Sequence, residues 1–328
     1  MDFQLKILLV SFVATIILSI IIIPILKKLK VGQMERDDGP QSHLKKQGTP
    51  TMGGIIMMIA ITIASIAGVM YYIGRGDEGL EAAKAMIPLI ITAFGFGLIG
   101  LIDDFKKIVL KNTKGLSPRA KMLGLLIMSV FFVIYLQYVL KLGTETLVPF
   151  FKTYIDLPLP LYVPFVIFVL LAITNSVNLT DGVDGLAATV CTVIITCLTV
   201  ISIILDVKEL VIFGSIAIGA CLGFLIFNLN PAKVMMGDTG SLLLGGIIGI
   251  MAIYLKMPFI ILIVGIIPVL EAVSVTLQVW YFKKTGRRIF KMAPLHHHFE
   301  LSGWKENKVV SIFAIITLIA SIVALCVI

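Results

Sequence analysis

The chain has 328 residues, of which 59% are hydrophobic and only 14% are charged, and its mean hydropathy is +1.06. These values exclude an ordinary soluble domain of this length and predict that a lipid bilayer is the solvent for most of the chain. The formal net charge of +8 favours anionic partners. Because no basic run alternates with aromatic residues, lipid headgroups and anionic substrates fit this charge better than nucleic acid.

Ten apolar runs are candidates to cross the bilayer, since a spanning helix needs about 20 mostly apolar residues to pair every backbone polar group. The third and eighth runs are short, and the first is too long for a signal peptide, so we expect it to be a retained helix. We therefore predict an all-α integral membrane protein with about ten transmembrane helices, in which residues 1–328 form one polytopic domain. In chain order the runs cover residues 4–26, 52–73, 86–102, 121–140, 158–177, 186–205, 210–228, 240–255, 258–281 and 309–328.

The distribution of Lys and Arg predicts the orientation of these runs. The odd-numbered connections between runs, together with Lys121 at a helix edge, hold 20 of the 27 Lys and Arg residues. Cytoplasmic loops carry the excess of Lys and Arg, so we expect the odd-numbered connections in the cytoplasm and both termini outside it. The other seven Lys and Arg residues lie at the N-terminus and in the even-numbered connections: Lys6, Arg75, Lys84, Lys141, Lys152, Lys208 and Lys256.

Five polar segments interrupt the apolar runs, and all five fall on the predicted cytoplasmic side. A membrane enzyme can build one water-facing active site in this way from distant parts of its chain. The segments are GTPTMGG (48–54), IDDFKK (102–107), NSVNLTDGVDG (175–185), NLNPAKVMMGDTGS (228–241) and MAPLHHHFE (292–300).

The second segment carries a carboxylate pair, Asp103 and Asp104, followed by Lys107. Asp103 and Lys107 are four residues apart, so on a continuing helix they would share one face. Such carboxylates could hold a divalent cation or accept a proton, and the lysine could hold a phosphate. A solvated helix end with positive-inside lysines explains the same residues, and the pair alone does not decide between these interpretations.

The third segment places Asn175, Asn178, Asp181 and Asp184 at intervals of three residues, which predicts a polar stripe along a helix that runs into a loop. Glycines follow both aspartates and permit a tight turn. Ordinary turns use the same residue types. The two asparagines lie at membrane depth, however, where an unpaired amide is costly, and this favours a functional stripe.

The fourth segment has Asn228 at the end of the seventh run and Asp238, between glycines and hydroxyl residues, at the start of the eighth. Asp238 could simply cap that helix. A helix N-terminus with these residue types is equally a place for a metal-phosphate group, and the two roles are compatible.

The fifth segment contains His296, His297 and His298, three of the four histidines in the chain. Three consecutive histidines cannot all face one metal from a regular helix, and zinc would need wider spacing. Imidazoles beside a phosphate site could instead donate hydrogen bonds to a diphosphate or a ribose.

The first segment supplies Thr51 and a glycine pair after Lys46, and taken alone it predicts only a flexible entry loop. Together the five segments provide carboxylates, amides, lysines and imidazoles, and they need no cysteine, catalytic serine or nucleotide P-loop. This inventory is typical of phosphoryl-group chemistry with Mg²⁺ at a membrane surface.

In content, order and spacing, these segments resemble the phospho-N-acetylmuramoyl-pentapeptide transferase family of the polyprenyl-phosphate N-acetylhexosamine-1-phosphate transferase superfamily. IDDFKK and the NxxNxxDGxDG stripe are shared across the superfamily, whereas GTPTMGG, MGDTGS and especially APLHHHFE resemble this branch. The resemblance covers essentially the whole chain. Met235 departs from it, because an aromatic residue is expected there, and this leaves a stacking contact to uracil without support.

The resemblance implies a multi-pass enzyme of the bacterial plasma membrane with a cytoplasmic active site. UDP-N-acetylmuramoyl-pentapeptide and undecaprenyl phosphate would give lipid I and UMP, with Mg²⁺ as cofactor. A homodimer is compatible with this, although the sequence does not fix the oligomeric state.

The resemblance also implies roles for individual residues. Asp238 would be the main metal ligand, and Asp103, supported by Asp104, would orient or deprotonate the lipid phosphate. Lys107 and His297 would belong to the catalytic group. Substrate binding would fall to Lys46, Thr51, Lys121, Asn175, Asn178, Asp181, Asp184, Asn228, His296 and His298.

Two other functions stay open on the sequence. A UDP-N-acetylglucosamine-1-phosphate transferase of the same superfamily would share the aspartates, but the triple histidine argues against it. A proton-coupled transporter would place acids near the middle of its spans, where only Glu271 lies, just after Pro268. Pro268 would kink or break the ninth run, and Glu271 would face either a groove for the lipid phosphate or a neighbouring side chain.

Overall fold

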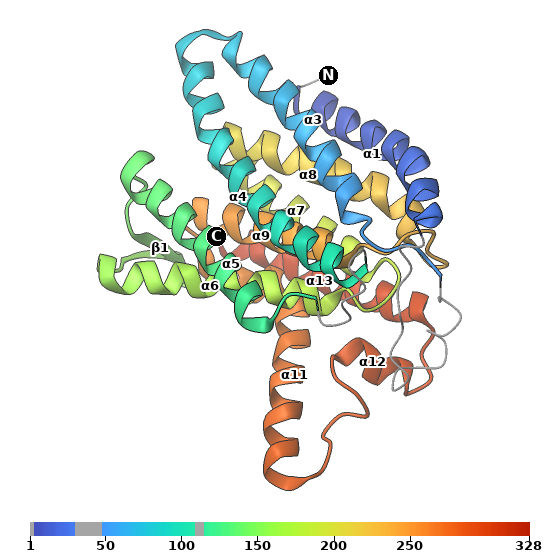
Figure 1. Ribbon diagram of the computed structural model, residues 1–328. Helices are drawn as coiled ribbons and strands as arrows, with labels where there is room; N and C mark the ends of the chain where they lie inside the picture. The colour runs from blue at the N-terminus through green and yellow to red at the C-terminus, as the bar shows by residue number, and fades with distance from the viewer. Residues whose placement is uncertain (1–2, 30–47, 109–114) are drawn as a thin grey trace.

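The computed structural model describes residues 3–29, 48–108 and 115–328, without the side chains of residues 77, 78 and 108. Ten segments of the described chain are helical, long and apolar enough to cross a bilayer, which confirms the predicted all-α, multi-span fold (Figure 1). The helices concerned are α1 (Phe3–Lys28), α3 (Gly54–Ile73), α4 (Gly76–Ile108), α5 (Pro118–Ile134), α6 (Leu159–Thr180), α7 (Leu186–Ile204), α8 (Lys208–Asn228), α9 (Gly237–Tyr254), α11 (Ile266–Thr285) and α13 (Glu306–Val327).

Short elements connect these helices. A π-helical turn, η1 (Tyr135–Val139), continues α5, and strands β1 (Glu145–Val148) and β2 (Thr153–Asp156) form an antiparallel hairpin with Glu145 opposite Asp156. Hydropathy did not predict this hairpin. The remaining short elements are η2 (Pro258–Ile260), α10 (Ile261–Val264) and α12 (Leu295–Glu300).

Helix α4 is much longer than the third apolar run. It begins at Gly76 instead of residue 86 and continues to Ile108, 33 residues in all, because its polar first turns and its last turns are helical as well. Asp103 and Asp104 therefore lie within the helix and not at its end. Their side chains are fixed by helical geometry and point in different directions.

The ninth run, predicted as one span over 258–281, is divided. Helix α10 ends at Val264, and α11 starts at Ile266, after a break at Gly265. The cause is Pro268, whose ring would clash with the carbonyl group of Val264, four residues earlier, in a continuous helix. The missing N–H of Pro268 costs little in the first turn of the new helix. Figure 1 shows α11 projecting beyond the other helices, with α12 beside it.

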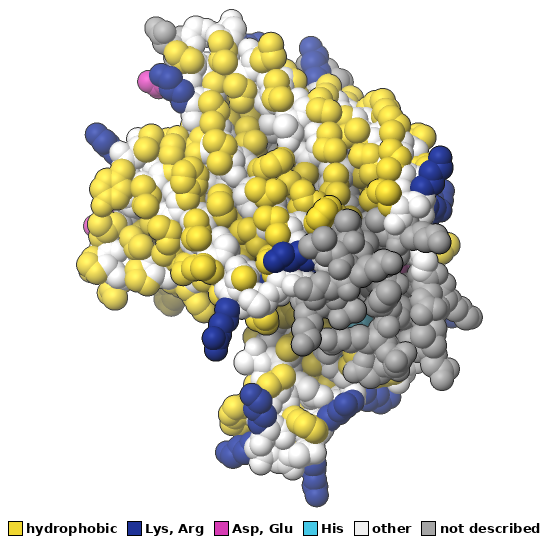
Figure 2. Space-filling view, viewed as in Figure 1, with side chains coloured by type: hydrophobic (Ala, Val, Ile, Leu, Met, Phe, Trp, Pro, Cys, Tyr) yellow, Lys and Arg dark blue, Asp and Glu magenta, His cyan; other side chains and the backbone are white. Residues whose placement is uncertain are grey.

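The most deeply buried spans are α8 and α9. The apolar stretch of α9 is 89% buried, whereas that of α1 is only 28% buried, so α9 lies inside the bundle and α1 at its margin. Figure 2 shows an almost continuous hydrophobic surface over the helices, with Lys and Arg side chains at its edges and around the projecting end of α11. A surface of this kind suits contact with lipid tails.

Candidate active site

The fourth polar segment, residues 228–241, is the central segment of the site. The backbone N–H groups of Gly53 and Gly54 donate to the carbonyl oxygens of Met235 and Met236, both at 2.9 Å. A Cβ on Gly54 would lie 2.1 Å from the backbone nitrogen of Gly240, so only glycine lets α3 and α9 begin in direct contact. The first and fourth polar segments are thereby joined.

The first segment and the residues just before it contain two predicted site residues, Thr51 and Lys46, and the structure describes only Thr51. Thr51 lies beside the central segment, because a Cβ on Gly237 would be 3.1 Å from the Thr51 hydroxyl oxygen. Lys46 lies outside the described residues.

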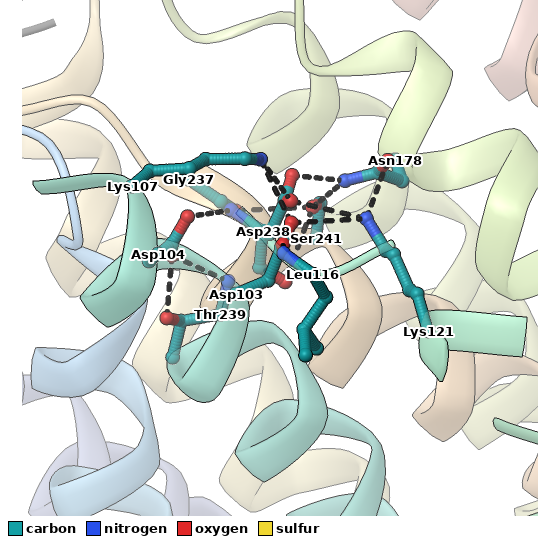
Figure 3. Close-up of polar contacts among 10 residues, drawn as sticks. All are labelled: Asp103, Asp104, Lys107, Leu116, Lys121, Asn178, Gly237, Asp238, Thr239 and Ser241. Carbon is teal, nitrogen blue, oxygen red and sulfur yellow. Dashed lines mark hydrogen bonds and ion pairs between the residues drawn. The ribbon is translucent and has the colours of Figure 1, made fainter. Parts of the chain in front are cut away.

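Asp104 fixes the start of α9 from the neighbouring helix α4 (Figure 3). Its Oδ2 accepts hydrogen bonds from the backbone N–H of Thr239, at 2.9 Å, and from the Thr239 hydroxyl, at 2.6 Å. Its Oδ1 accepts from the N–H of Asp238, at 3.1 Å. The first N–H groups of a helix have no partner within it, so Asp104 caps α9 and holds Asp238 in place.

Asp238 lies where four helices meet. Its Oδ2 is 2.7 Å from Lys107 Nζ and 3.0 Å from Lys121 Nζ, on α4 and α5. Its Oδ1 accepts a hydrogen bond from the side chain of Asn178 on α6, at 2.7 Å. Figure 3 shows the two lysines approaching Asp238 from different sides. Lys107, Lys121, Asn178 and Asp238, all predicted site residues, are therefore in direct contact.

The Asn178 amide also donates to the hydroxyl of Ser241, at 2.8 Å. Sequence reasoning did not assign Ser241 to the site. Its spacing of three residues from Asp238 places both on one face of α9, and this was the signal that could have identified it.

Asp103 lies beside the same lysines. Its Oδ2 is 2.8 Å from Lys107 Nζ, which confirms that the two residues share a helix face, and 3.7 Å from Lys121 Nζ. Its Oδ1 accepts a 2.6 Å hydrogen bond from the N–H of Leu116. Gly115, which sequence reasoning also missed, has φ +60°, and a Cβ there would lie 2.5 Å from Asp103 Oδ1. Only glycine gives the backbone this close approach.

Asp181 adds a further carboxyl group, close to Gly237 and to the carboxylates of Asp238 and Asp104. Burial, followed by the negative charges of Asp238 and Asp104, raises the pKa of Asp181 to about 8. With Asp181 protonated near neutral pH, Asp103, Asp104 and Asp238 still carry one more charge than Lys107 and Lys121, so the cluster offers a place to an additional cation.

Asp184 and Asn228 fix the backbone of the central segment, Asp184 from the third polar segment and Asn228 from within the central segment. Oδ2 of Asp184 accepts from the N–H of Ala232 and the side chain of Asn230, both at 3.0 Å. The Asn228 amide donates to the carbonyl oxygen of Val234, at 2.9 Å. Both side chains are buried, at 2% exposure. These contacts fix the shape of the loop that leads into α9.

Asn175, the first residue of the stripe, donates its side-chain N–H to the carbonyl oxygen of Leu171, one turn earlier, at 2.7 Å. The hydrogen bond satisfies the amide within its own helix. The stripe of Asn and Asp residues thus reaches the aspartate cluster through Asn178 and Asp181, and the central segment through Asp184.

The first histidine joins the fifth polar segment to the third. His296 is fully buried, and its Nδ1 lies 3.1 Å from Oε1 of the equally buried Glu271. A Cβ on Gly182 would lie 2.1 Å from Nε2 of His296, so the imidazole packs directly against the turn after α6. Of the two surroundings proposed for Glu271, the structure shows pairing with a neighbour.

The other two histidines have separate partners. Nδ1 of His297 lies 2.9 Å from Oε2 of Glu300, and Nδ1 of His298 accepts from the N–H of Lys291, at 3.1 Å. Across the described residues, no group of three or more His, Cys, Asp or Glu side chains is arranged to hold a metal ion. The histidine segment is therefore no zinc-type centre by itself.

Comparison with known proteins identifies the family. The family model described as glycosyl transferase family 4 matches residues 86–256, and the phospho-N-acetylmuramoyl-pentapeptide-transferase signature 1 matches residues 46–56. The phospho-N-acetylmuramoyl-pentapeptide-transferase of Acetivibrio thermocellus is 48% identical over 314 residues, which are 95% of this chain and 91% of that protein. The chain belongs to the phospho-N-acetylmuramoyl-pentapeptide transferase family.

Other members of the family are similarly close. The transferase of Caldicellulosiruptor bescii is 46% identical, with 97% of this chain and 95% of that protein aligned. The transferase of Staphylococcus carnosus is 44% identical, with 96% of each chain aligned. The resemblance read from the polar segments is confirmed, and the chain is a phosphoglycosyl transferase of peptidoglycan synthesis, so the transporter hypothesis is wrong.

Proposed function

We propose that this chain transfers the phospho-N-acetylmuramoyl-pentapeptide group from its UDP-linked form to undecaprenyl phosphate, at the cytoplasmic face of the bacterial plasma membrane. The products are lipid I and UMP. The observation that carries this proposal is the convergence of Lys107 and Lys121 on Asp238, beside Asp103, in a chain of this family. Both substrates are anions, so a site for them needs cations next to oriented oxygen ligands.

The reaction is a displacement at phosphorus. A phosphate oxygen of undecaprenyl phosphate forms a bond to the sugar-proximal phosphorus, and the bond from that phosphorus to the bridging diphosphate oxygen breaks. UMP leaves with the bridging oxygen. The lipid phosphate is acidic enough to be largely ionised already, so a general base contributes little. We favour direct attack over a covalent aspartyl intermediate.

Lys107 and Lys121 hold phosphate groups in this proposal. Both ammonium groups contact Asp238. With the substrates present, they reach the phosphates and offset the repulsion between the two anions and the charge on the leaving group. Asp103, fixed by the N–H of Leu116, orients the lipid phosphate. Asp104 supports the reaction by capping α9.

The remaining residues form the nucleotide and sugar pocket. Asn175, Asn178 and Asp181 contribute through the helical stripe, while Asp184 and Asn228 act through the central segment that they hold. The pocket is completed by Lys46, Thr51, His296, His297 and His298.

The donor set suits Mg²⁺, which prefers oxygen ligands and takes one or two carboxylates together with water and substrate phosphates. The carboxylates of Asp103, Asp104 and Asp238 outnumber the ammonium groups of Lys107 and Lys121, which leaves negative charge for a divalent ion. Asp238 would be its principal ligand, with Asp103 next to it. When bound, the ion supplies stabilisation of the negative charge that develops on the diphosphate.

The test is an assay of UMP release by the purified protein in nanodiscs. Turnover should require UDP-N-acetylmuramoyl-pentapeptide, undecaprenyl phosphate and Mg²⁺, each omitted in turn, and mass spectrometry should find lipid I. Equal turnover with UDP-N-acetylglucosamine as donor would refute the proposed specificity and favour the other branch of the superfamily.

A further inference from the structure

A cavity of about 750 Å³ lies between the start of α1, the α3–α4 turn and the α7–α8 turn. It is at the other end of the bundle from the aspartate cluster. Helix α3 begins in contact with α9 at that cluster and ends at Ile73, next to the cavity, and its 20 residues span about 30 Å. In Figure 1 the start of α1 and the α3–α4 turn lie in the upper part of the view, away from the start of α9.

Three cationic side chains line this cavity: Lys6, Arg75 and Lys208. They are three of the seven Lys and Arg residues that the chain places at its N-terminus and in the even-numbered connections. Among the described lining residues Asp206 is the one carboxylate. Within the described chain, no carboxylate lies within 4.0 Å of the ammonium or guanidinium groups of these three residues. Three cations that face one space, with no ion-pair partner among the described side chains, favour a bound anion.

An aromatic platform holds the guanidinium group of Arg75 in place. The guanidinium carbon of Arg75 lies 4.3 Å from the centre of the Tyr71 ring, which stacks on Phe3 at 3.3 Å. The Tyr72 hydroxyl donates to the carbonyl oxygen of Lys208, at 3.1 Å, and so joins α3 to the start of α8. Tyrosines of this kind gather at the headgroup level of a bilayer. Stacked Arg75 presents a planar set of donors that matches a phosphate.

Apolar side chains continue from the cavity along the outside of the bundle. Leu5 and Leu9 on α1 are 45% and 42% exposed, and Met70 and Ile73 on α3 are 68% and 55% exposed. A lipid with its headgroup in the cavity would lay its acyl chains over these side chains. A free anion would make no use of them.

We propose that this cavity binds the phosphate headgroup of an anionic phospholipid in the leaflet opposite the candidate active site. Arg75 and Lys208 bind the phosphate oxygens, Lys6 adds a third positive charge, and the aromatic rings pack against the glycerol region. The cavity shares no residue with the aspartate cluster, so this site is separate from the candidate active site.

Native mass spectrometry of the detergent-solubilised protein, titrated with phosphatidylglycerol, phosphatidylcholine or inorganic phosphate, tests this proposal. The wild type should retain phosphatidylglycerol more tightly than phosphatidylcholine. The double variant Arg75→Gln/Lys208→Gln should bind phosphatidylglycerol at least about tenfold more weakly, because it loses two charge-assisted contacts. The control Lys141→Gln/Lys152→Gln makes the same change of charge at positions outside the cavity and should bind like the wild type.

Equal affinity of the two double variants for phosphatidylglycerol would overturn the proposal, as would equal retention of the two lipids by the wild type. Binding of inorganic phosphate alone, lost in Arg75→Gln/Lys208→Gln, would identify a free anion as the ligand and reject the lipid. If the double variant fails to give a monodisperse protein, Lys6→Gln, in an exposed position on α1, takes its place with Lys141→Gln as control.

Discussion

Asp104 on α4 accepts hydrogen bonds from both the backbone N–H and the hydroxyl of Thr239 on α9, 135 positions later in the chain. Its neighbour Asp103 points about 100° away around the helix and contacts Lys107 instead. The adjacent aspartates therefore differ in function. Asp104 positions the residue that the lysines contact, whereas Asp103 faces the space between the lysines.

Asp104→Asn should lower the free energy of unfolding by about 1–3 kcal/mol, because an amide N–H would replace one acceptor oxygen and leave a buried donor at α9 unsatisfied. Thermal unfolding in detergent, followed by intrinsic fluorescence, measures this loss. Glu81→Gln, at an exposed position of the same helix, is the control. An Asp104→Asn protein as stable as this control would contradict the capping role.

Asp238→Asn should reduce UMP release by more than about a hundredfold while the protein stays folded, since the lysines and the proposed Mg²⁺ share this carboxylate. Titration of Mg²⁺ in the UMP-release assay measures the effect. Wild-type dependence on Mg²⁺ in this variant would move the principal metal ligand to another carboxylate, with Asp104 or Asp181 as candidates.

Gly115→Ala should reduce turnover by about tenfold or more, because the new Cβ would lie 2.5 Å from Asp103 Oδ1 and force the carboxylate away from Leu116. Displacements of about 1 Å in an active site can cost a hundredfold in rate. Gly143→Ala is a matched control, since Gly143 also has positive φ, +80°, but nothing within 4 Å of its Cβ position. Equal activity of the two variants would show that the geometry of Asp103 is unimportant.

Asp103→Asn should cripple turnover and leave binding of the UDP-sugar intact, whereas Asp184→Ala should weaken that binding first. Without the Asp184 carboxylate, the N–H of Ala232 has no acceptor, and leaving this donor unsatisfied costs about 1–3 kcal/mol. The backbone of the central segment is then held less firmly. Calorimetry with the UDP-sugar measures both variants. The opposite pattern, with nucleotide binding abolished in Asp103→Asn and unchanged in Asp184→Ala, would reverse the assignment.

The side of the membrane that each end of the bundle faces can be tested with single cysteines. We expect a cysteine at Arg287, just after α11, to be protected from an impermeant reagent in intact cells, and one at Thr153, in the β-hairpin, to react. Both side chains are exposed in the fold, so a difference in labelling would report the side of the membrane and not burial within the protein. Labelling at Arg287 and protection at Thr153 would invert the predicted orientation.

The sequence by itself determined the properties that depend on local composition and helical spacing. The ten spans follow from apolar runs long enough for a bilayer, and the shared face of Asp103 and Lys107 follows from their spacing of four residues. The motifs around Asp238 and the histidines identified the family, because they combine a distinctive content with a fixed order along the chain.

Only the tertiary structure decided which residues are partners. The capping of α9 by Asp104, the support of the central segment by Asp184, and the close approach of Gly115 to Asp103 all join positions on different elements. Helical periodicity says which face a side chain occupies and nothing about which helix that face meets. That choice depends on how the spans pack together, and packing is set by contacts between side chains far apart in the chain.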